Sequence, residues 1–344
     1  MPYKGLKGVN EAYGTFLGLV SHEYFHLWNV KRIRPAAFAN SDLASEAYTE
    51  LLWVFEGITS YYDDLQLLRS GLITTQQYLK LLGQTVTRVE RGAGRRRQSV
   101  ADSSFDAWIK FYKPDANAGN AIVSYYAKGA LIALCLDLKL RLDTEGRVSL
   151  DDVMHESWRR FGVTGKGMLE SEFEEMCAEV SGLDLGDFFD AAVRGTGELP
   201  LENLLDSHGV LWKQRRPISR EDKGGDKGDP AKVLNVTIGA TLTEQNGKSV
   251  FTVIDNDSPA ERAGVAPGDQ AVALDGLLLD AANLSARLKR YRPGDKLELI
   301  VFRGDELLTL NICLNAAPEN RIYLELDAEV SEERAARQQS WLTV

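Results

Sequence analysis

The sequence predicts a multidomain α+β protein, in which a mostly helical domain is followed by a small β-rich domain. Apolar residues recur at helical spacing as far as about residue 210, whereas from Val233 they alternate in short runs bounded by glycine and proline. Between these two parts, residues 215–230 are charged and lack apolar periodicity, which is typical of a linker or a mobile hairpin tip. At 344 residues, the chain is long enough to bury two separate cores.

The composition excludes several classes of partner. A formal net charge of −10 argues against nucleic acid and against an anionic membrane surface. No run approaches the roughly 20 apolar residues of a membrane-spanning helix. Cys135, Cys177 and Cys313 are isolated, which indicates neither a disulfide framework nor a cysteine zinc site. Residues 1–5 lack the apolar region of a signal peptide, so a cytoplasmic and a periplasmic location both stay open.

The first predicted helix, residues 11–30, contains the motif H-E-x-x-H at residues 22–26. His22 and His26 are four residues apart and would therefore lie on one helix face, where two imidazoles can bind one metal ion. Glu23 would project beside them, where a carboxylate can take a proton from an activated water molecule. The bare motif is also compatible with two hydrogen-bonded core histidines. Because apolar residues surround the motif, we expect a buried helix.

A third ligand would favour the metal site, and Glu56 is the candidate. It is a single acid among Trp53, Val54 and Phe55 in a predicted helix over 41–68, and such a carboxylate is costly to bury unless it is paired or binds a metal. Two histidines and one glutamate with an open fourth position form a common catalytic zinc set. Glu46 and Glu50 are alternative ligands, but their polar neighbours predict that they face solvent.

At this point the chain resembles a known family. The strings H-E-Y-F-H-L-W-N-V-K-R-I-R-P (residues 22–35) and W-x-x-E-G-x-T-x-Y-Y (residues 53–62) resemble the glycyl aminopeptidase family of gluzincin zinc metallopeptidases, and the resemblance extends over almost the whole chain. It implies a mostly helical, thermolysin-like catalytic subdomain, one Zn²⁺ per chain, and release of N-terminal glycine or alanine from peptide or protein substrates. Relatives carry a β-rich region upstream. Only 21 residues precede His22, and we expect that region to be missing from this chain.

Further helices are predicted over 74–89 and from residue 120 to about 142, with a loop-rich segment over 92–120 between them. Trp108, Phe111 and Tyr112 are expected to anchor that segment. The start of the 120–142 helix is similar to a gluzincin segment whose tyrosine donates to the developing oxyanion. A phenol stays protonated at neutral pH and can donate this hydrogen bond. Alignment with the family motif assigns the role to Tyr126 rather than Tyr125.

Smaller elements complete the helical part. Helices are predicted over 149–161, 169–181 and 183–192, and residues 201–210 are expected to close the domain. We expect Lys128 to be solvated or salt-bridged, and both His155 and His208 to lie at the surface.

The last third resembles a PDZ domain of the bacterial type. The string S-P-A-x-x-A-G-x-x-x-G-D spans residues 258–269 and lies between the predicted strands. Such domains take a peptide as an added β-strand, and backbone amides receive its terminal carboxylate; Ile238 and Gly239 are the counterpart of that loop. A PDZ fold used only as an intramolecular brace is the alternative. The expected boundaries are 1–214, a linker over 215–231, the PDZ domain over 232–318, and a peripheral tail over 319–344.

The sequence therefore predicts a zinc peptidase in which His22, His26 and Glu56 hold the metal, Glu23 is the base and Tyr126 stabilises the oxyanion. Three other interpretations stay open. The chain could be a metallo-endopeptidase, or a peptide-binding PDZ protein with an inactive zinc domain. A helical domain that uses zinc only as a structural staple is the third.

Overall fold

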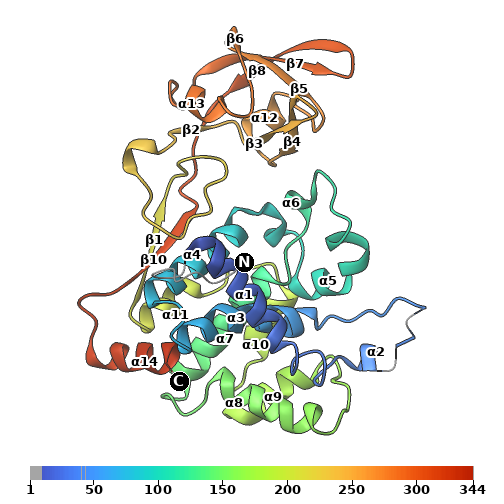
Figure 1. Cartoon of the computed structure of the whole chain (residues 1–344), viewed down its shortest axis with the longest axis vertical. Coiled ribbons are helices and arrows are strands. Elements are labelled where there is room, and N and C mark those ends of the chain that lie inside the picture. The colour runs from blue at the N-terminus through green and yellow to red at the C-terminus, as the bar shows by residue number, and fades with distance from the viewer. Residues whose placement is uncertain (1–9, 40, 43, 344) are drawn as a thin grey trace.

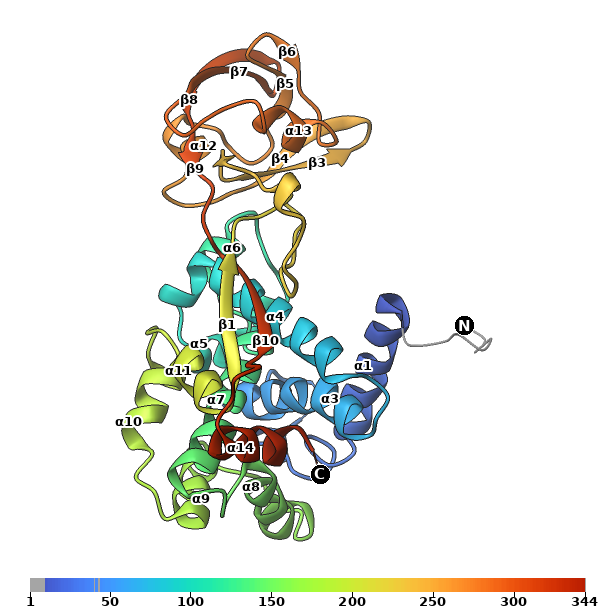
Figure 2. The same ribbon diagram turned by 90° about the vertical axis from the view of Figure 1, so that its left-hand side faces the viewer.

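The computed structural model describes residues 10–39, 41–42 and 44–343, which form two bodies with separate hydrophobic cores. Figures 1 and 2 show a helical domain below, a β-rich domain above, and a two-stranded ribbon that runs along the helical domain towards the β-rich one. The predicted α+β architecture, helical first and then β-rich, is confirmed.

The helical domain consists of short and medium helices, several of which contain π-helical turns. Their bounds are α1 Glu11–Phe25, α2 Ala36–Ala39, η1 Trp53–Gly57, α3 Ile58–Arg69, α4 Thr75–Arg91, η2 Ala93–Arg96, α5 Val100–Phe105, η3 Ala107–Phe111, α6 Ala118–Ala121, α7 Ala127–Asp143, α8 Leu150–Ser157, η4 Trp158–Gly162, α9 Glu172–Ser181, α10 Gly186–Phe189, η5 Asp190–Arg194 and α11 Leu201–Ser207. The helix predicted from residue 41 begins only at residue 53, and the one predicted to residue 30 ends at residue 25.

Helix α7 forms the centre of this domain. It is apolar on nearly every side, and its residues from 127 to 138 are all buried. Such a helix is stable only when other elements surround it completely. The turn η1 packs directly against it, because Gly57 and Gly129 let the two backbones approach. A Cβ atom at Gly57 would lie 2.6 Å from the Gly129 Cα. This close contact sets the position of Glu56, the residue before Gly57.

Helix α1 is not the buried helix that its sequence predicts. Leu17 and Phe25 pack on the core, but Phe16, Leu19 and Val20 are 54%, 58% and 48% exposed. Helix α3 packs against one side of α1, and no described residue covers the other side. The apolar composition of a segment indicates which residues favour burial. Which of them are buried depends on the elements that pack against the segment in the tertiary structure.

The ribbon consists of β1 (Val210–Arg215) and β10 (Arg321–Leu326), which pair antiparallel from Val210↔Leu326 to Arg215↔Arg321. The linker that follows β1 is held in place and is not a mobile hairpin tip. Arg215 pairs with the Asp222 carboxylate, while Arg91 and Arg321 donate to the Asp222 carbonyl at 3.3 and 2.7 Å. These bonds tie the linker to α4 and to β10.

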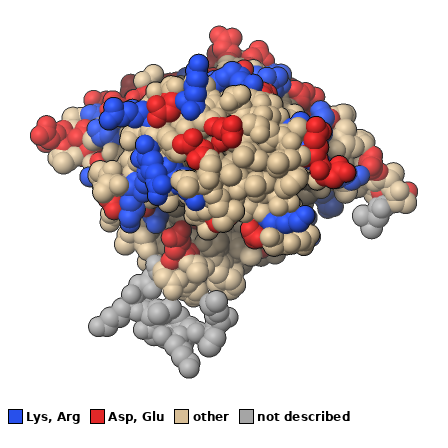
Figure 3. All heavy atoms as spheres, turned by 90° about the horizontal axis from the view of Figure 1, so that it is seen from above, with Lys and Arg blue, Asp and Glu red and all other residues tan. Residues whose placement is uncertain are grey.

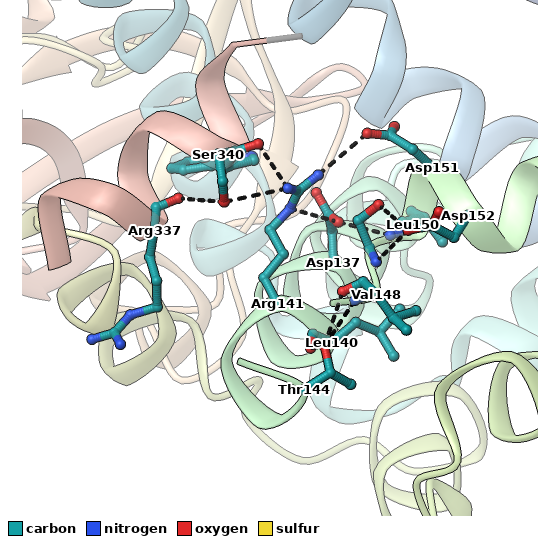
Figure 4. A network of polar contacts seen from close by, with 12 residues as sticks. Asp137, Leu140, Arg141, Thr144, Val148, Leu150, Asp151, Asp152, Arg337 and Ser340 are labelled. Atoms are coloured by element: carbon teal, nitrogen blue, oxygen red, sulfur yellow. Dashed lines mark hydrogen bonds and ion pairs between the residues drawn. The ribbon is translucent and has the colours of Figure 1, made fainter. Parts of the chain in front are cut away.

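The C-terminal segment is not the peripheral tail that we expected. Helix α14 (Glu332–Leu342) packs on the helical domain, and its Trp341 is fully buried and donates to the Tyr61 hydroxyl at 3.0 Å. Arg141 of α7 donates to the Ser340 carbonyl at 2.7 Å and to Asp137 at 3.0 Å, as Figure 4 shows. The chain leaves the helical domain through β1 and returns to it through β10. The residues that follow β10 can therefore pack on the helical domain.

His208 is also buried, contrary to the expectation that it is exposed. Its Nδ1 lies 2.8 Å from the Leu204 carbonyl, and its ring meets that of Trp341 at 6.3 Å. Burial lowers the pKa of His208. The covering group belongs to α14, more than a hundred residues later, so the local sequence carries no sign of it.

The β-rich domain contains a six-stranded sheet with the order β3-β4-β5-β7-β8 and β6 beside β5. Its elements are η6 Pro230–Lys232, β2 Val236–Thr237, β3 Ala240–Gln245, β4 Lys248–Ile254, α12 Pro259–Arg262, β5 Gln270–Leu274, β6 Leu277–Leu278, α13 Leu284–Leu288, β7 Lys296–Arg303, β8 Glu306–Cys313 and β9 Asn315–Ala316. Strand β2 pairs with β9. Among the described strands, β3 has a partner only on its β4 side, so its other edge is open.

The two domains touch beyond the ribbon, through the buried side chain of Asn120 in α6. Asn120 donates to the Ile254 carbonyl at 2.7 Å and accepts from the Asn256 amide at 3.0 Å. Arg220 of the linker binds the carboxylate of the intervening residue, Asp255, at 2.7 and 3.0 Å. The turn after β4 is therefore held from two sides.

None of the helices in the described ranges is long and apolar enough to cross a bilayer. Figure 3 views the molecule from the end that carries the β-rich domain, where Lys and Arg side chains are interspersed with Asp and Glu. This face presents no extended surface of one charge sign.

Candidate metal centre

The structure brings His22, His26 and Glu56 together, and one ligand atom from each lies within 4.8 Å of the others. The two histidines come from the last turn of α1 and its C-terminal cap, and their rings meet edge to face at 4.6 Å. Glu56 Oε2 lies 3.3 Å from His22 Nε2 and 3.2 Å from His26 Nε2. The donor set suits a tetrahedral zinc ion with one position left open.

The outer ring nitrogens of both histidines are also held. His22 Nδ1 lies 3.2 Å from Asp63 Oδ2, and His26 Nδ1 lies 2.9 Å from the Asn29 carbonyl. These bonds direct both Nε2 atoms towards Glu56, which is how proteins commonly orient metal-binding histidines. Sequence reasoning missed Asp63. The available signal was its place seven residues after Glu56, which puts it on the same helix face.

Asn29 connects the histidine segment to the segment that carries Glu56. It is buried, and its amide donates to the Val54 carbonyl at 3.0 Å and the Phe55 carbonyl at 3.3 Å. Together with the contact between Gly57 and Gly129, this bond fixes η1 beside the end of α1. Residues 22–35 are thus both ligand-bearing and ligand-positioning, and sequence reasoning used Asn29 only as part of a matching string.

The electrostatics of the three side chains are those of a site for a cation. Burial opposes ionisation of Glu56, but hydrogen bonds from His22 and His26 lower its pKa to about 2. Burial likewise opposes the charged form of His22, but hydrogen bonds to Asp63 and Glu56 raise its pKa to about 9. Two carboxylates therefore favour a positive charge at the imidazoles, and a divalent cation can replace the protons there.

Glu23 lies next to His22 on the exposed side of α1. Among the described residues it has no hydrogen-bond or ion-pair partner. A general base needs a carboxylate that is free to meet a water molecule, so this environment is compatible with the predicted role.

Tyr126 lies beside the histidines, with its ring centroid 6.3 Å from that of His22. Burial raises the pKa of the Tyr126 hydroxyl above its ordinary value, so the group stays protonated and can donate a hydrogen bond. Tyr125 stacks on Tyr126 at 4.7 Å and is buried. Of the two tyrosines, Tyr126 is the one whose ring neighbours a predicted ligand.

Other predictions near the centre have mixed outcomes. Glu46, Glu50 and His155 are exposed, as expected. The prediction for Lys128 is wrong, because its side chain is only 2% exposed and its Nζ has no hydrogen-bond partner in the described part of the chain. It belongs to α7, which is enclosed on all sides. The nearby carboxylates of Glu90 and Glu198 form ion pairs with Arg95 rather than with Lys128.

The predictions for the three expected anchors of the loop-rich segment also have different outcomes. Phe111 packs against the core, but Trp108 and Tyr112 are half exposed or more.

The predicted peptide-binding loop of the β-rich domain is built from backbone. Ile238 is buried and its carbonyl accepts from the Ala260 amide at 2.9 Å. Gly239 has a φ of 66°, and its carbonyl accepts from the Asp255 amide at 2.8 Å. Its own amide donates to Thr237 Oγ1 at 2.9 Å. The open-edged strand β3 begins immediately afterwards.

Comparisons with known proteins find a matching family model for each of the two domains and a solved structure that is similar to nearly the whole chain. Residues 15–132 match the family model "M61 glycyl aminopeptidase", and residues 236–314 match the family model of the PDZ domain. The crystal structure of an aminopeptidase N family protein from Idiomarina loihiensis is similar to 99% of this chain, with 39% sequence identity and a TM-score of 0.92. The present chain spans 57% of that protein's length. No curated protein matches the sequence significantly.

Two proteases match only a part of the chain. An HtrA-type protease, AlgW with decapeptide, matches 25% of this chain and 30% of its own, at 22% identity and a TM-score of 0.24. A serine endoprotease from Yersinia pestis matches 26% and 32%, at 19% identity and a TM-score of 0.23. The family models and the Idiomarina structure support a peptidase function. The chain therefore matches the M61 glycyl aminopeptidase model in its helical part and the PDZ model in its β-rich part, as the resemblance predicted.

Proposed function

We propose that this chain carries the catalytic centre of a zinc-dependent aminopeptidase that acts on peptides with a small N-terminal residue. The observation that supports it most is the convergence of His22, His26 and Glu56, with ligand atoms within 4.8 Å, beside an unpaired glutamate and a protonated tyrosine. The preference for glycine comes from the family description alone.

In this proposal, His22, His26 and Glu56 hold one Zn²⁺. When bound, the ion would lower the pKa of a water molecule and polarise the carbonyl of the scissile bond. Asp63 and the Asn29 carbonyl keep both imidazoles oriented with Nε2 inward. A site with only three protein ligands leaves a position for substrate, which a purely structural site does not.

The proton transfers fall to Glu23 and the charge stabilisation to Tyr126. Glu23 takes a proton from the attacking water and delivers it to the leaving amine. As the carbonyl oxygen becomes negative, the Tyr126 hydroxyl donates a hydrogen bond to it. A donor that is already held in place stabilises this charge without further reorganisation.

The test uses Glu23→Gln, which keeps the shape of the side chain but removes the base. We expect zinc content to stay near one per chain by elemental analysis, while hydrolysis of Gly- and Ala-peptides falls by about 10²-fold or more. Glu50→Gln is the matched control, because Glu50 is exposed and does not belong to the group of side chains whose ligand atoms converge. Hydrolysis that survives in a zinc-loaded Glu23→Gln variant would exclude this mechanism.

N-acetylated peptides separate the remaining alternatives. An aminopeptidase rejects blocked substrates, whereas a metallo-endopeptidase cleaves them. If zinc binds stoichiometrically but neither class of peptide is cleaved, the ion is a structural staple or the domain is inactive in this chain.

A second candidate function is peptide binding by the PDZ domain. It is favoured by the open edge of β3 and by the turn at Gly239. We expect the full chain to bind peptides with a free C-terminal carboxylate and to bind their amidated forms less well, as measured by fluorescence anisotropy. Gly239→Ala should abolish this difference, because a Cβ there would lie 2.3 Å from the Ser258 Cβ. Gly247→Ala, also at positive φ but in open space, is its control.

A further inference from the structure

Three tyrosine hydroxyls form a continuous chain at the edge of the metal centre. Tyr125 donates to the Tyr112 hydroxyl at 3.2 Å, and the Tyr112 and Tyr126 hydroxyls lie 3.0 Å apart. Tyr112 follows η3 in the loop-rich segment, whereas the other two precede α7. The chain therefore joins two segments, and Tyr112 is its central member.

The number of protons that each hydroxyl can donate favours one direction for the hydrogen bonds among the three tyrosines. A phenol has one proton to donate. Tyr125 uses its proton on the Tyr112 oxygen. The geometry allows either hydroxyl of the Tyr112–Tyr126 pair, 3.0 Å apart, to be the donor, and in one of the two arrangements Tyr112 donates its own proton to the Tyr126 oxygen. Tyr126 then accepts from Tyr112 and retains its own proton, which remains free to be donated towards the histidines and substrate. If Tyr126 donated to Tyr112 instead, that proton would be occupied before substrate arrives.

We propose that Tyr112 is a positioning residue that donates to Tyr126 and thereby holds the Tyr126 proton available for the developing oxyanion. This inference rests on the proposed peptidase function. Hydrogen-bonded chains of hydroxyls polarise one another, so the donation from Tyr125 through Tyr112 also makes Tyr126 a better donor.

The packing around the chain supports a fixed geometry. The Phe111 ring lies 4.8 Å from that of Tyr125 and 5.7 Å from that of Tyr126, and thus holds both tyrosines against the segment that carries Tyr112. Tyr112 itself is 60% exposed. Tyr112→Phe removes the acceptor of the Tyr125 proton, but the substitution itself is at a largely exposed side chain, so the variant is expected to fold.

The experiment compares Tyr112→Phe, Tyr126→Phe and the double variant in the zinc-loaded full chain. Tyr112→Phe should lower kcat about 3- to 10-fold with little change in KM, as expected for one hydrogen bond felt in the transition state. Tyr126→Phe should lower kcat about 10²-fold. Because Tyr112 acts through Tyr126, the double variant should be no slower than Tyr126→Phe alone. Tyr323→Phe is the matched control, since Tyr323 lies in β10 and its hydroxyl has no hydrogen-bond partner among the described residues.

A binding measurement provides a readout that does not depend on turnover. A dipeptide analogue with a phosphonate in place of the scissile amide presents a charged tetrahedral oxygen. Calorimetry should show that Tyr112→Phe weakens binding of this analogue by a similar factor. Binding of an amino acid amide, which lacks the tetrahedral anion, should be unchanged, and zinc content should stay near one per chain.

The outcomes separate the two proposals. An unchanged or raised kcat in Tyr112→Phe, with Tyr126→Phe impaired, would overturn the inference while leaving the peptidase proposal intact. A reduction that adds fully to that of Tyr126→Phe would also overturn it, because Tyr112 would then act independently. If the wild-type chain hydrolyses no peptide, or Tyr126→Phe is as fast as wild type, the proposed function or its oxyanion donor fails, and the role of Tyr112 fails with it.

Discussion

The helical domain and the PDZ domain carry candidate sites of opposite construction. The metal centre is made of side chains from α1 and η1, whose ligands are 30 residues apart between His26 and Glu56. The peptide-binding loop is made of backbone groups in one short stretch around Gly239. Residue identity therefore carries most of the information about the first site and little about the second. In addition, the first site depends on packing against α7, whereas the second depends on one backbone conformation.

The strongest test of this comparison removes one side chain from the metal centre. Glu56→Gln should cost most of the bound zinc, because an amide is a poor zinc ligand and two histidines alone hold the ion far less tightly. Elemental analysis should give well under one zinc per chain, while binding of C-terminal peptides by the PDZ domain stays as in wild type. Glu46→Gln, an exposed position, should retain the metal. Equal zinc content in both variants would remove Glu56 from the ligand set.

A residue that supports the ligands should have a smaller effect. Asp63→Asn removes the carboxylate that holds His22 Nδ1 and should weaken zinc binding by about 10- to 100-fold. Competition with a chelator of known affinity measures the change. Asp143→Asn serves as the control, because Asp143 pairs with Lys139 at the far end of α7. An affinity within twofold of wild type would mean that the ring of His22 is held by packing alone.

The metal-free protein should depend on pH in a way that the PDZ site does not. The folded pKa of His22 is about 9, above the ordinary 6.5, so its stabilising pairing is fully present below pH 6.5 and is lost as pH rises through 9. The folded pKa of Glu56 is about 2, below the ordinary 4.5, so its contribution is present above pH 4.5 and is lost as pH falls through 2.

We therefore expect the stability difference between metal-free wild type and Glu56→Gln to be largest between about pH 4.5 and 6.5, and to shrink towards pH 9. Thermal or denaturant unfolding across this range measures it. Comparing the two proteins cancels the titration of shared groups that do not interact with Glu56. A difference that grows above pH 9 would contradict the assignment.

The smallest expected effect concerns the contact between the domains. Asn120→Ala removes both hydrogen bonds to the turn after β4, which the Arg220–Asp255 pair still holds. We expect a loss of about 1–2 kcal/mol in the free energy of unfolding and faster hydrogen exchange at Asn256, with unchanged zinc content. Asn203→Ala, at an exposed asparagine of α11, is the control. Unchanged exchange at Asn256 would show that the ribbon and linker alone fix the two domains.

The fold and the ligand set were largely predictable from the sequence, because both depend on residue type and spacing. Four-residue spacing places His22 and His26 on one helix face, and a lone acid in an apolar segment marks Glu56. The change from helical to alternating periodicity indicated the second domain. These signals are local, and each can be evaluated without knowledge of distant contacts.

The errors in predicted burial concern contacts between segments far apart in the chain, whereas two helix boundaries were wrong locally. His208 and Lys128 looked like surface residues, yet α14 covers the first and the enclosure of α7 buries the second. The apolar face of α1 looked buried but meets no described residue that covers it. In each case the residue type indicates whether a side chain favours burial. Whether it is actually buried depends on which distant segment the fold brings against it.

The same division applies to the site. The sequence by itself determined which residues are the candidate ligands and base, because zinc chemistry requires particular atoms, and the family resemblance pointed to the tyrosine. Only the tertiary structure decided that Asp63 and Asn29 orient the imidazoles, that Gly57 against Gly129 places Glu56, and that Tyr112 stands between Tyr125 and Tyr126. Orientation depends on distances of a few ångströms between separate elements, and these are set when the elements pack around α7.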